Sequence, residues 1–217
     1  MKLMIITGLT LFLLALTAGA EQTYTYGWED GIGTVLGTFG NVGSVENTDE
    51  IVQSDTRSLK AVEDPISGTP QLYIWWVTGL TDGDTVESSF YGYAPNDNTY
   101  ARQRIWAHYT SDPNDIDSYA TSAGGNETYT SDIGLDWQQV TNKWIMNTSG
   151  GTNDGIVIEA RMYSGTTDAS YYTHYIDTTA ITVSSDTAVI HRADGTVVPE
   201  PSALVLAALL GMFLKRK

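Results

Sequence analysis

The 217-residue chain has no cysteine, so no disulfide can stabilise it. Cations are also scarce. Residues 21–198 contain 25 Asp and Glu but only 7 Lys and Arg, a formal charge of −18. Such a surface repels nucleic acid and anionic lipid, and acidic side chains on loops can collect calcium. Apolar residues at helical spacing are almost absent as well, whereas Thr, Ser, Gly, Tyr and Trp are frequent, which indicates an all-β protein.

Long uncharged runs occur only near the two ends. Lys2 precedes the apolar run 3–16, and Ala18-Gly19-Ala20 supplies the small residues that a signal peptidase accepts. We therefore expect residues 1–20 to be a secretory signal peptide, cut by signal peptidase before Glu21. A short N-terminal anchor is the alternative. By its length, the remainder up to residue 195 is one domain.

The second run, residues 203–214, carries no charge and ends in three cations at residues 215–217. The positive-inside rule keeps these cations in the cytoplasm and the domain outside. Because the run is shorter than the roughly 20 residues of a stable membrane span, it suits a transient anchor. A C-terminal helix packed on the domain is the alternative, but a helix that is apolar all round argues against it.

Residues 196–217 as a whole combine Pro199-Glu200-Pro201, the apolar run and the basic end, and in this order they resemble a PEP-CTERM sorting signal. The resemblance implies that an exosortase recognises Pro199, Glu200 and Pro201 and removes the helix. It also implies that the protein is then released from the cell or attached to its surface, in bacteria that make extracellular polysaccharide.

Short segments separated by turn residues fill the domain. Alternation or continuous apolarity predicts about nine or ten strands, which suits a two-sheet β-sandwich of the jelly-roll type. The predicted strands are 23–28, 50–53, 58–63, 71–78, 85–93, 102–109, 136–145, 155–163 and 171–183. Residues 71–78 are apolar on both faces and are predicted to be central. Residues 112–126 are predicted to be a loop, and the glycine-rich residues 31–43 a loop or an irregular strand.

Three of these strands carry a polar and aromatic face opposite an apolar one. If strands 85–93, 102–109 and 155–163 share a sheet, one open surface gathers side chains that can bind a ligand. Aromatic rings stack on sugar C–H surfaces, while Arg and Glu hydrogen-bond hydroxyl or carboxylate groups. Packing of the rings and a surface lattice of ion pairs are the alternative explanation. The candidate residues are Glu87, Tyr91, Tyr93, Arg102, Arg104, Trp106, His108, Glu159, Arg161 and Tyr163.

Four short motifs follow one another along the domain: 28–31 (WEDG), 58–62 (SLKAV), 136–140 (DWQQV) and 175–177 (YID). In this order they resemble the jelly-roll carbohydrate-binding modules and the galactose-binding-like domains. The resemblance implies a structural calcium ion held by Glu29 and Asp177. The chain departs from the pattern at Thr178, where many relatives have a second aspartate.

A non-catalytic module that binds polysaccharide, acidic polysaccharide included, is therefore the favoured function. Catalysis is an alternative, because some lyases are jelly rolls. A lyase needs a base and a cation beside the substrate carboxylate, for which His108, Tyr91, Tyr163 and Arg104 are candidates, and Glu87 with Glu159 is the acid pair for a glycosidase. Motifs of metal hydrolases, phosphate loops and nucleophile elbows are absent. A structural protein of the extracellular matrix, without a defined ligand, is the third hypothesis.

Overall fold

The computed structural model describes residues 21–32, 34–93, 95, 101–133, 136–164 and 171–198. The predicted signal peptide and the sorting motif Pro199, Glu200 and Pro201 lie outside the described residues. No helix in the described part of the chain is long and apolar enough to cross a membrane.

The described residues form two antiparallel sheets that pack face to face, which confirms the predicted all-β sandwich. In the first sheet β1 pairs with β11, and the other strands follow the order β3-β4-β11-β6-β9. These strands are β1 (Gln22–Tyr26), β3 (Val42–Thr48), β4 (Ser58–Glu63), β6 (Thr85–Tyr93), β9 (Gln138–Ile145) and β11 (Tyr172–Val183).

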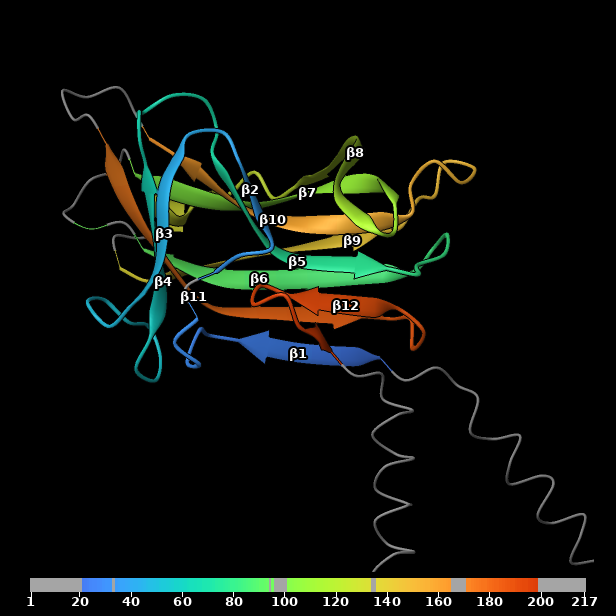
Figure 1. The fold of residues 1–217 in the computed structure, drawn as a ribbon, viewed down its shortest axis with the longest axis horizontal. Helices are drawn as coiled ribbons and strands as arrows, with labels where there is room; N and C mark the ends of the chain where they lie inside the picture. The colour runs from blue at the N-terminus through green and yellow to red at the C-terminus, as the bar shows by residue number, and fades with distance from the viewer. Residues whose placement is uncertain are drawn as a thin grey trace, which may run out of the picture.

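The second sheet has the order β13-β12-β5-β10-β7-β8, and β2 pairs with β5 at its side. Its strands are β2 (Gly37–Phe39), β5 (Gln71–Thr78), β7 (Arg102–Asp112), β8 (Asp115–Gly125), β10 (Gly155–Tyr163), β12 (Val189–Arg192) and β13 (Val197–Val198). In Figure 1, β7 and β8 lie in the upper part of the view, and β1 and β12 lie in the lower part. A single helical turn, α2 (Thr130–Ile133), precedes β9.

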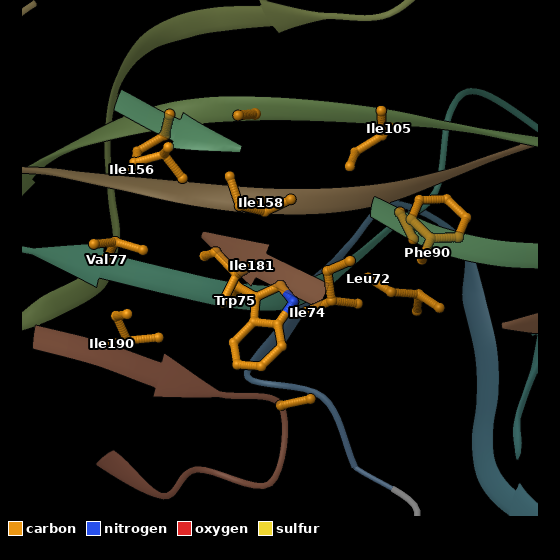
Figure 2. Close-up of a cluster of buried hydrophobic side chains, with 14 of the residues drawn as sticks. Leu72, Ile74, Trp75, Val77, Phe90, Ile105, Ile156, Ile158, Ile181 and Ile190 are labelled. Atoms are coloured by element: carbon orange, nitrogen blue, oxygen red, sulfur yellow. The ribbon is translucent and has the colours of Figure 1, made fainter. Parts of the chain in front are cut away.

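The core between the sheets comes from the inward positions of each strand (Figure 2). Phe90 of β6 and Ile181 of β11 face Ile105 and Ile158 of the second sheet, and all four are 0–1% exposed. Strict alternation along β6, β7 and β10 places these residues inward, as the sequence predicts. Burying each such side chain contributes about 1.5–3 kcal/mol of stability.

Strand β5 is central and buried on both faces, as predicted. Ile74 and Trp75 both belong to the main core although they are consecutive. An irregularity in the pairing of β5 with β10, between Ile158 and Glu159, accompanies this break in alternation. Tyr73 and Trp76 consequently lie on the opposite face of the second sheet, in a small apolar cluster with Val157, Leu36 and Ile116.

Two local predictions are wrong. Residues 112–126 are not a loop, because β7 continues to Asp112 and turns back as β8, which forms a hairpin. The segment 50–53 lies outside every strand. Of the two possibilities for 31–43, the structure has short strands, because β2 and the start of β3 fall in it. The turn between Asp112 and Asp115 has the composition of a loop, although the flanking residues pair as antiparallel strands with several register shifts.

Candidate functional site

The candidate ligand residues do not lie on one surface. Strand β6 hydrogen-bonds to β11 and β9 and so belongs to the first sheet, whereas β7 and β10 belong to the second. Glu87, Tyr91 and Tyr93 are therefore separated by the sandwich core from the candidates on β7 and β10. Single-strand alternation identifies the outward face of each strand but not which sheet the strand joins. The expectation of one shared surface is wrong.

The candidates on β7 and β10 do come together. The two strands pair directly, with Arg104 opposite Arg161 and Trp106 opposite Glu159. Ile105 and Ile158 point into the core, so the alternate residues point outward. The outer face of the second sheet thus gathers Arg102, Arg104, Trp106, His108, Glu159, Arg161 and Tyr163.

Cations and aromatic rings alternate across this face. The guanidinium carbon of Arg102 lies 4.0 Å from the ring centroid of Tyr129, and that of Arg104 lies 5.1 Å from the same ring. Arg104 and Arg161 lie 4.5 and 4.8 Å from the ring of Trp106. Each contact is within the range of a cation–π interaction. We call the three arginines with Tyr129 and Trp106 the arginine ladder.

Hydrogen bonds hold Arg104 and Trp106 in place within the ladder. Arg104 Nε donates to the hydroxyl of Tyr163 at 2.8 Å, and Arg104 Nη1 pairs with Glu127 at 2.8 Å. The Trp106 indole N–H donates to Ser122 Oγ on β8 at 3.0 Å. Held in this way, the partly exposed ring of Trp106 and the guanidinium of Arg104 lose little further freedom when a ligand binds.

His108 and Glu159 lie at the buried end of the same face. They are 2% and 1% exposed, and His108 Nδ1 is 2.5 Å from Glu159 Oε1. Arg161 Nε donates to the second oxygen of Glu159, also at 2.5 Å. The ring of Tyr73 packs against His108 at 5.2 Å, and burial, with the charge of Glu159, raises the pKa of Tyr73 to about 12. His108, Glu159 and Tyr73 are thus buried beneath the exposed side chains of this face and pack against them.

Over the first sheet, Tyr93 packs against Trp137 at 5.5 Å and against Tyr175 at 6.2 Å. Glu87 forms an exposed ion pair with Lys143 at 3.7 Å. Since Glu87 and Glu159 lie on different sheets, they cannot act as the paired acids of a glycosidase. Tyr91 is likewise on the other sheet from His108, which removes it from a shared lyase site.

The predicted calcium residues, Glu29 and Asp177, lie near each other. Burial is the largest cause of a raised pKa at Asp177, and the negative charge of Glu29 adds to it. Backbone N–H groups of Gln53 and Ser54 donate to Asp177 at 2.9 and 3.1 Å. Glu29 accepts hydrogen bonds from Thr56 and Arg57. Within the described residues, no group of three or more His, Asp or Glu side chains could hold a metal ion.

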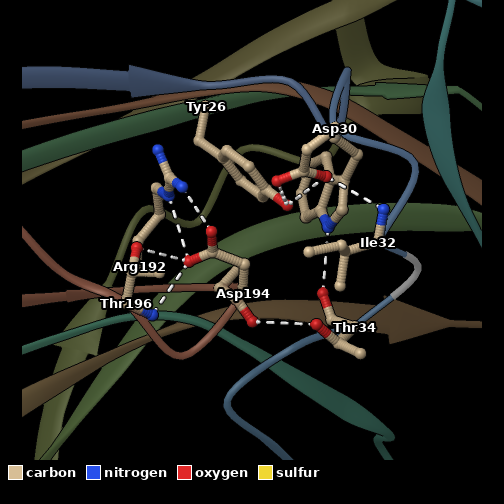
Figure 3. A network of polar contacts seen from close by, with 9 residues as sticks. Tyr26, Asp30, Ile32, Thr34, Arg192, Asp194 and Thr196 are labelled. Carbon is tan, nitrogen blue, oxygen red and sulfur yellow. Dashed lines mark hydrogen bonds and ion pairs between the residues drawn. The ribbon is translucent and has the colours of Figure 1, made fainter.

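A polar pocket of about 370 Å³ opens beside Glu29, and the ring of Tyr26 forms part of its wall. The Tyr26 hydroxyl donates to both carboxylate oxygens of Asp30 (Figure 3). Arg192 lies over the Tyr26 ring at 4.6 Å and pairs with Asp194. This network ties the hairpin of β12 and β13 to the end of β1.

Comparison with solved structures places the fold among known ones. The tandem CBM22-1-CBM22-2 domain of Paenibacillus barcinonensis Xyn10C matches with a TM-score of 0.50 at 17% identity, over 78% of this chain and 46% of that one. The fold is that of carbohydrate-binding modules. The single CBM22-1 xylan-binding domain of the same protein matches at 16% identity and a TM-score of 0.46, over 78% of this chain and 99% of that one.

Caldicellulosiruptor saccharolyticus CBM27-1, solved with mannohexaose, matches at 12% identity and a TM-score of 0.42, over 73% of this chain and 96% of that one. No family model and no curated protein matches the sequence. At these identities the likeness to a carbohydrate-binding module concerns the fold, and the site must be argued from this chain's own residues.

Sequence reasoning missed several residues of the face. Tyr129 and Glu127 lie in the segment between β8 and α2, where no strand alternation shows which way a side chain points. Ser122 was assigned to a loop. The one available signal is composition, since Glu127 and Tyr129 stand on either side of Thr128 just after β8.

Proposed function

We propose that the protein is a non-catalytic module that binds polysaccharide through the outer face of the second sheet. The arginine ladder carries this proposal. Its Trp106 ring is partly exposed and offers apolar surface to a sugar, and the guanidinium groups of Arg104 and Arg161, which lie over this ring, offer hydrogen-bond donors beside that surface. Tyr163 and Ser122 fix these groups beforehand.

Retention of the full chain on immobilised polysaccharides tests the proposal. We expect the wild type to be retained and Trp106→Ala to be released. Trp137→Ala is the matched control, because Trp137 is a partly exposed indole over the other sheet. Equal retention of all three proteins would contradict the site. Absence of retention on every glycan would favour a structural matrix protein.

The lyase alternative is tested in the same samples by absorbance of an unsaturated sugar product. His108, its candidate base, is 2% exposed and lies between the rings of Tyr73 and Tyr119. Its Nδ1 is occupied by Glu159. This arrangement favours support of the face over proton abstraction, so we expect no product.

Export and sorting belong to the same proposal. The apolar runs and the Pro199-Glu200-Pro201 motif support transport by a signal peptide and processing by an exosortase at the cell envelope, after transient anchoring in the inner membrane. Mass spectrometry of the mature protein should find no residue beyond about Ser202. A mature protein that still carries Lys217 would contradict processing by an exosortase.

A further inference from the structure

Three arginines lie close together on the outer face of the second sheet, although the chain as a whole is acidic. The whole chain carries a formal charge of −15. Yet Arg102, Arg104 and Arg161 all lie on this face, and the carboxylates that pair with them are those of Glu127 and Glu159. Among the described residues, three guanidinium groups thus form ion pairs with two carboxylates, so one guanidinium group has no ion-pair partner there.

Arg102 carries that guanidinium group. No carboxylate pairs with it within the part of the chain that the structure describes, in contrast to Arg104 and Arg161. Its guanidinium lies 4.0 Å from the ring of Tyr129. Stacking uses the flat face of the guanidinium, whereas its N–H donors lie at the edge and in the plane. The edge of Arg102 is therefore suited to a planar acceptor.

Arg104 adds a second set of donors close by, because both arginines stack on the same Tyr129 ring. Its carboxylate partner, Glu127, is held loosely. The side chain of Glu127 is 80% exposed, whereas that of Arg104 is 13% exposed. An ion pair with one solvated, flexible end contributes little stability, so another carboxylate can replace Glu127.

We infer that the sugar recognised on this face is a uronic acid, whose carboxylate is held by Arg102 and Arg104 while its ring contacts the exposed part of Trp106. This inference rests on the proposed polysaccharide-binding function. A carboxylate is planar and matches the guanidinium fork through two parallel hydrogen bonds. In the bound state the ligand carboxylate takes the place of Glu127 on Arg104.

The test compares matched pairs of polymers that differ in one group. Polygalacturonate, alginate, glucuronoxylan and hyaluronate are each measured beside the same polymer after its carboxyl groups have been reduced to primary alcohols. We expect the full chain to bind at least one uronate polymer about 10-fold or more tightly than its reduced partner. Binding should weaken as sodium chloride is raised, because salt screens exposed charges.

Arg102→Gln should reduce the affinity for the uronate form to that for the reduced form. Lys143→Gln is the matched control, since it removes a positive charge from the other sheet. Glu127→Gln should tighten uronate binding several-fold by removing the internal competitor, an effect that a purely structural Glu127 would not give. In an Arg104→Gln background, adding Glu127→Gln should no longer tighten uronate binding.

Equal affinity for a uronate polymer and its reduced partner would overturn the inference while leaving polysaccharide binding intact. Discrimination that survives in both Arg102→Gln and Arg104→Gln would overturn it as well. If no polymer of either kind binds, the proposed function fails together with the inference.

Discussion

His108 and Glu159 are joined by a 2.5 Å contact under the outer face of the second sheet, and both side chains are almost completely buried. Glu159 also accepts a hydrogen bond from Arg161, so one buried carboxylate holds two nitrogen donors. Sequence alternation placed all three residues on a ligand-binding face. Their burial instead indicates that His108 and Glu159 stabilise the face, while Arg161 forms one end of the arginine ladder.

Glu159→Ala should therefore destabilise the fold. The substitution leaves Arg161 and His108 without their buried acceptor, and breaking such a pair costs about 3–5 kcal/mol. Glu159→Gln keeps one acceptor oxygen and should cost less. Urea unfolding followed by tryptophan fluorescence measures both. Glu87→Gln, in an exposed ion pair, is the control and should change stability by less than about 1 kcal/mol. A Glu159→Ala protein as stable as wild type would contradict the structural role.

Gly125 is required by the packing of Trp106 against β8. A Cβ on Gly125 would lie 2.3 Å from the Ile105 carbonyl oxygen and 2.7 Å from both the Cα and a ring carbon of Trp106. Gly125→Ala should therefore destabilise the domain by about 1–3 kcal/mol and displace the indole.

The measurements for Gly125→Ala are the melting temperature and glycan retention. The exposed Thr121 of the same strand supplies the control, Thr121→Ala, which should stay within about 0.5 kcal/mol of wild type. If Gly125→Ala binds glycan and melts as wild type does, the close packing of Trp106 against Gly125 does not hold the indole in place.

The sequence predicts the sandwich well because the signal is local. Ile105 and Ile158 recur at period two on their strands, and burial of one face suffices to place them inward. Sheet membership is not local. Strand β6 resembles β7 in pattern but pairs with β11, whose partner residues lie about 90 positions further along the chain. This non-local choice divides the candidate site, so Tyr91 and Arg104 end on opposite faces.

Calcium at Glu29 and Asp177 stays a prediction with a direct test. Burial, and to a smaller extent the charge of Glu29, raises the pKa of Asp177, so a divalent cation between the two carboxylates would relieve their repulsion. Calcium in 100-fold excess over its dissociation constant would add about 2.7 kcal/mol and raise the melting temperature by several degrees.

Glu29→Gln should abolish the calcium-dependent shift. This variant is more informative than one at Asp177, which also accepts three backbone N–H groups. Glu46→Gln, at an exposed acid paired with Lys60, is the control and should keep the shift. Equal melting temperatures in calcium and in EDTA would exclude the ion.

His174 forms a buried polar link between the sheets. The Gln103 amide donates to His174 Nδ1 at 2.9 Å and to the Tyr93 carbonyl at 3.2 Å, while Gln103 Oε1 accepts from Thr130. This arrangement fixes the amide orientation and leaves the imidazole neutral, with its proton on Nε2. Within the described residues Nε2 has no hydrogen-bond partner, and Glu63 Oε2 lies 3.9 Å away.

Stability should therefore fall as the pH is lowered through the histidine range. Burial lowers the pKa of His174 in the folded state, and the nearby Glu63 only partly opposes this effect. Above about pH 6.5 both the folded and the unfolded states are neutral at this residue. Below about pH 6.5 the imidazole is protonated in the unfolded state but stays neutral in the folded state. The free energy of unfolding therefore decreases by up to about 1.4 kcal/mol per pH unit, until the pH reaches the lower pKa of the folded state.

Urea unfolding at pH 7.5, 6.5 and 5.5 measures this dependence. His174→Gln, whose amide is never charged, should flatten the curve between pH 6.5 and 5.5 relative to wild type. His191→Gln is the comparison: its ring is partly exposed and stacks on Trp76, burial lowers its pKa as well, and its loss should leave the His174 contribution in place. Because the acidic groups are common to all three proteins, the comparison isolates the imidazole. Parallel curves for wild type and His174→Gln would show that His174 takes up its proton equally in both states.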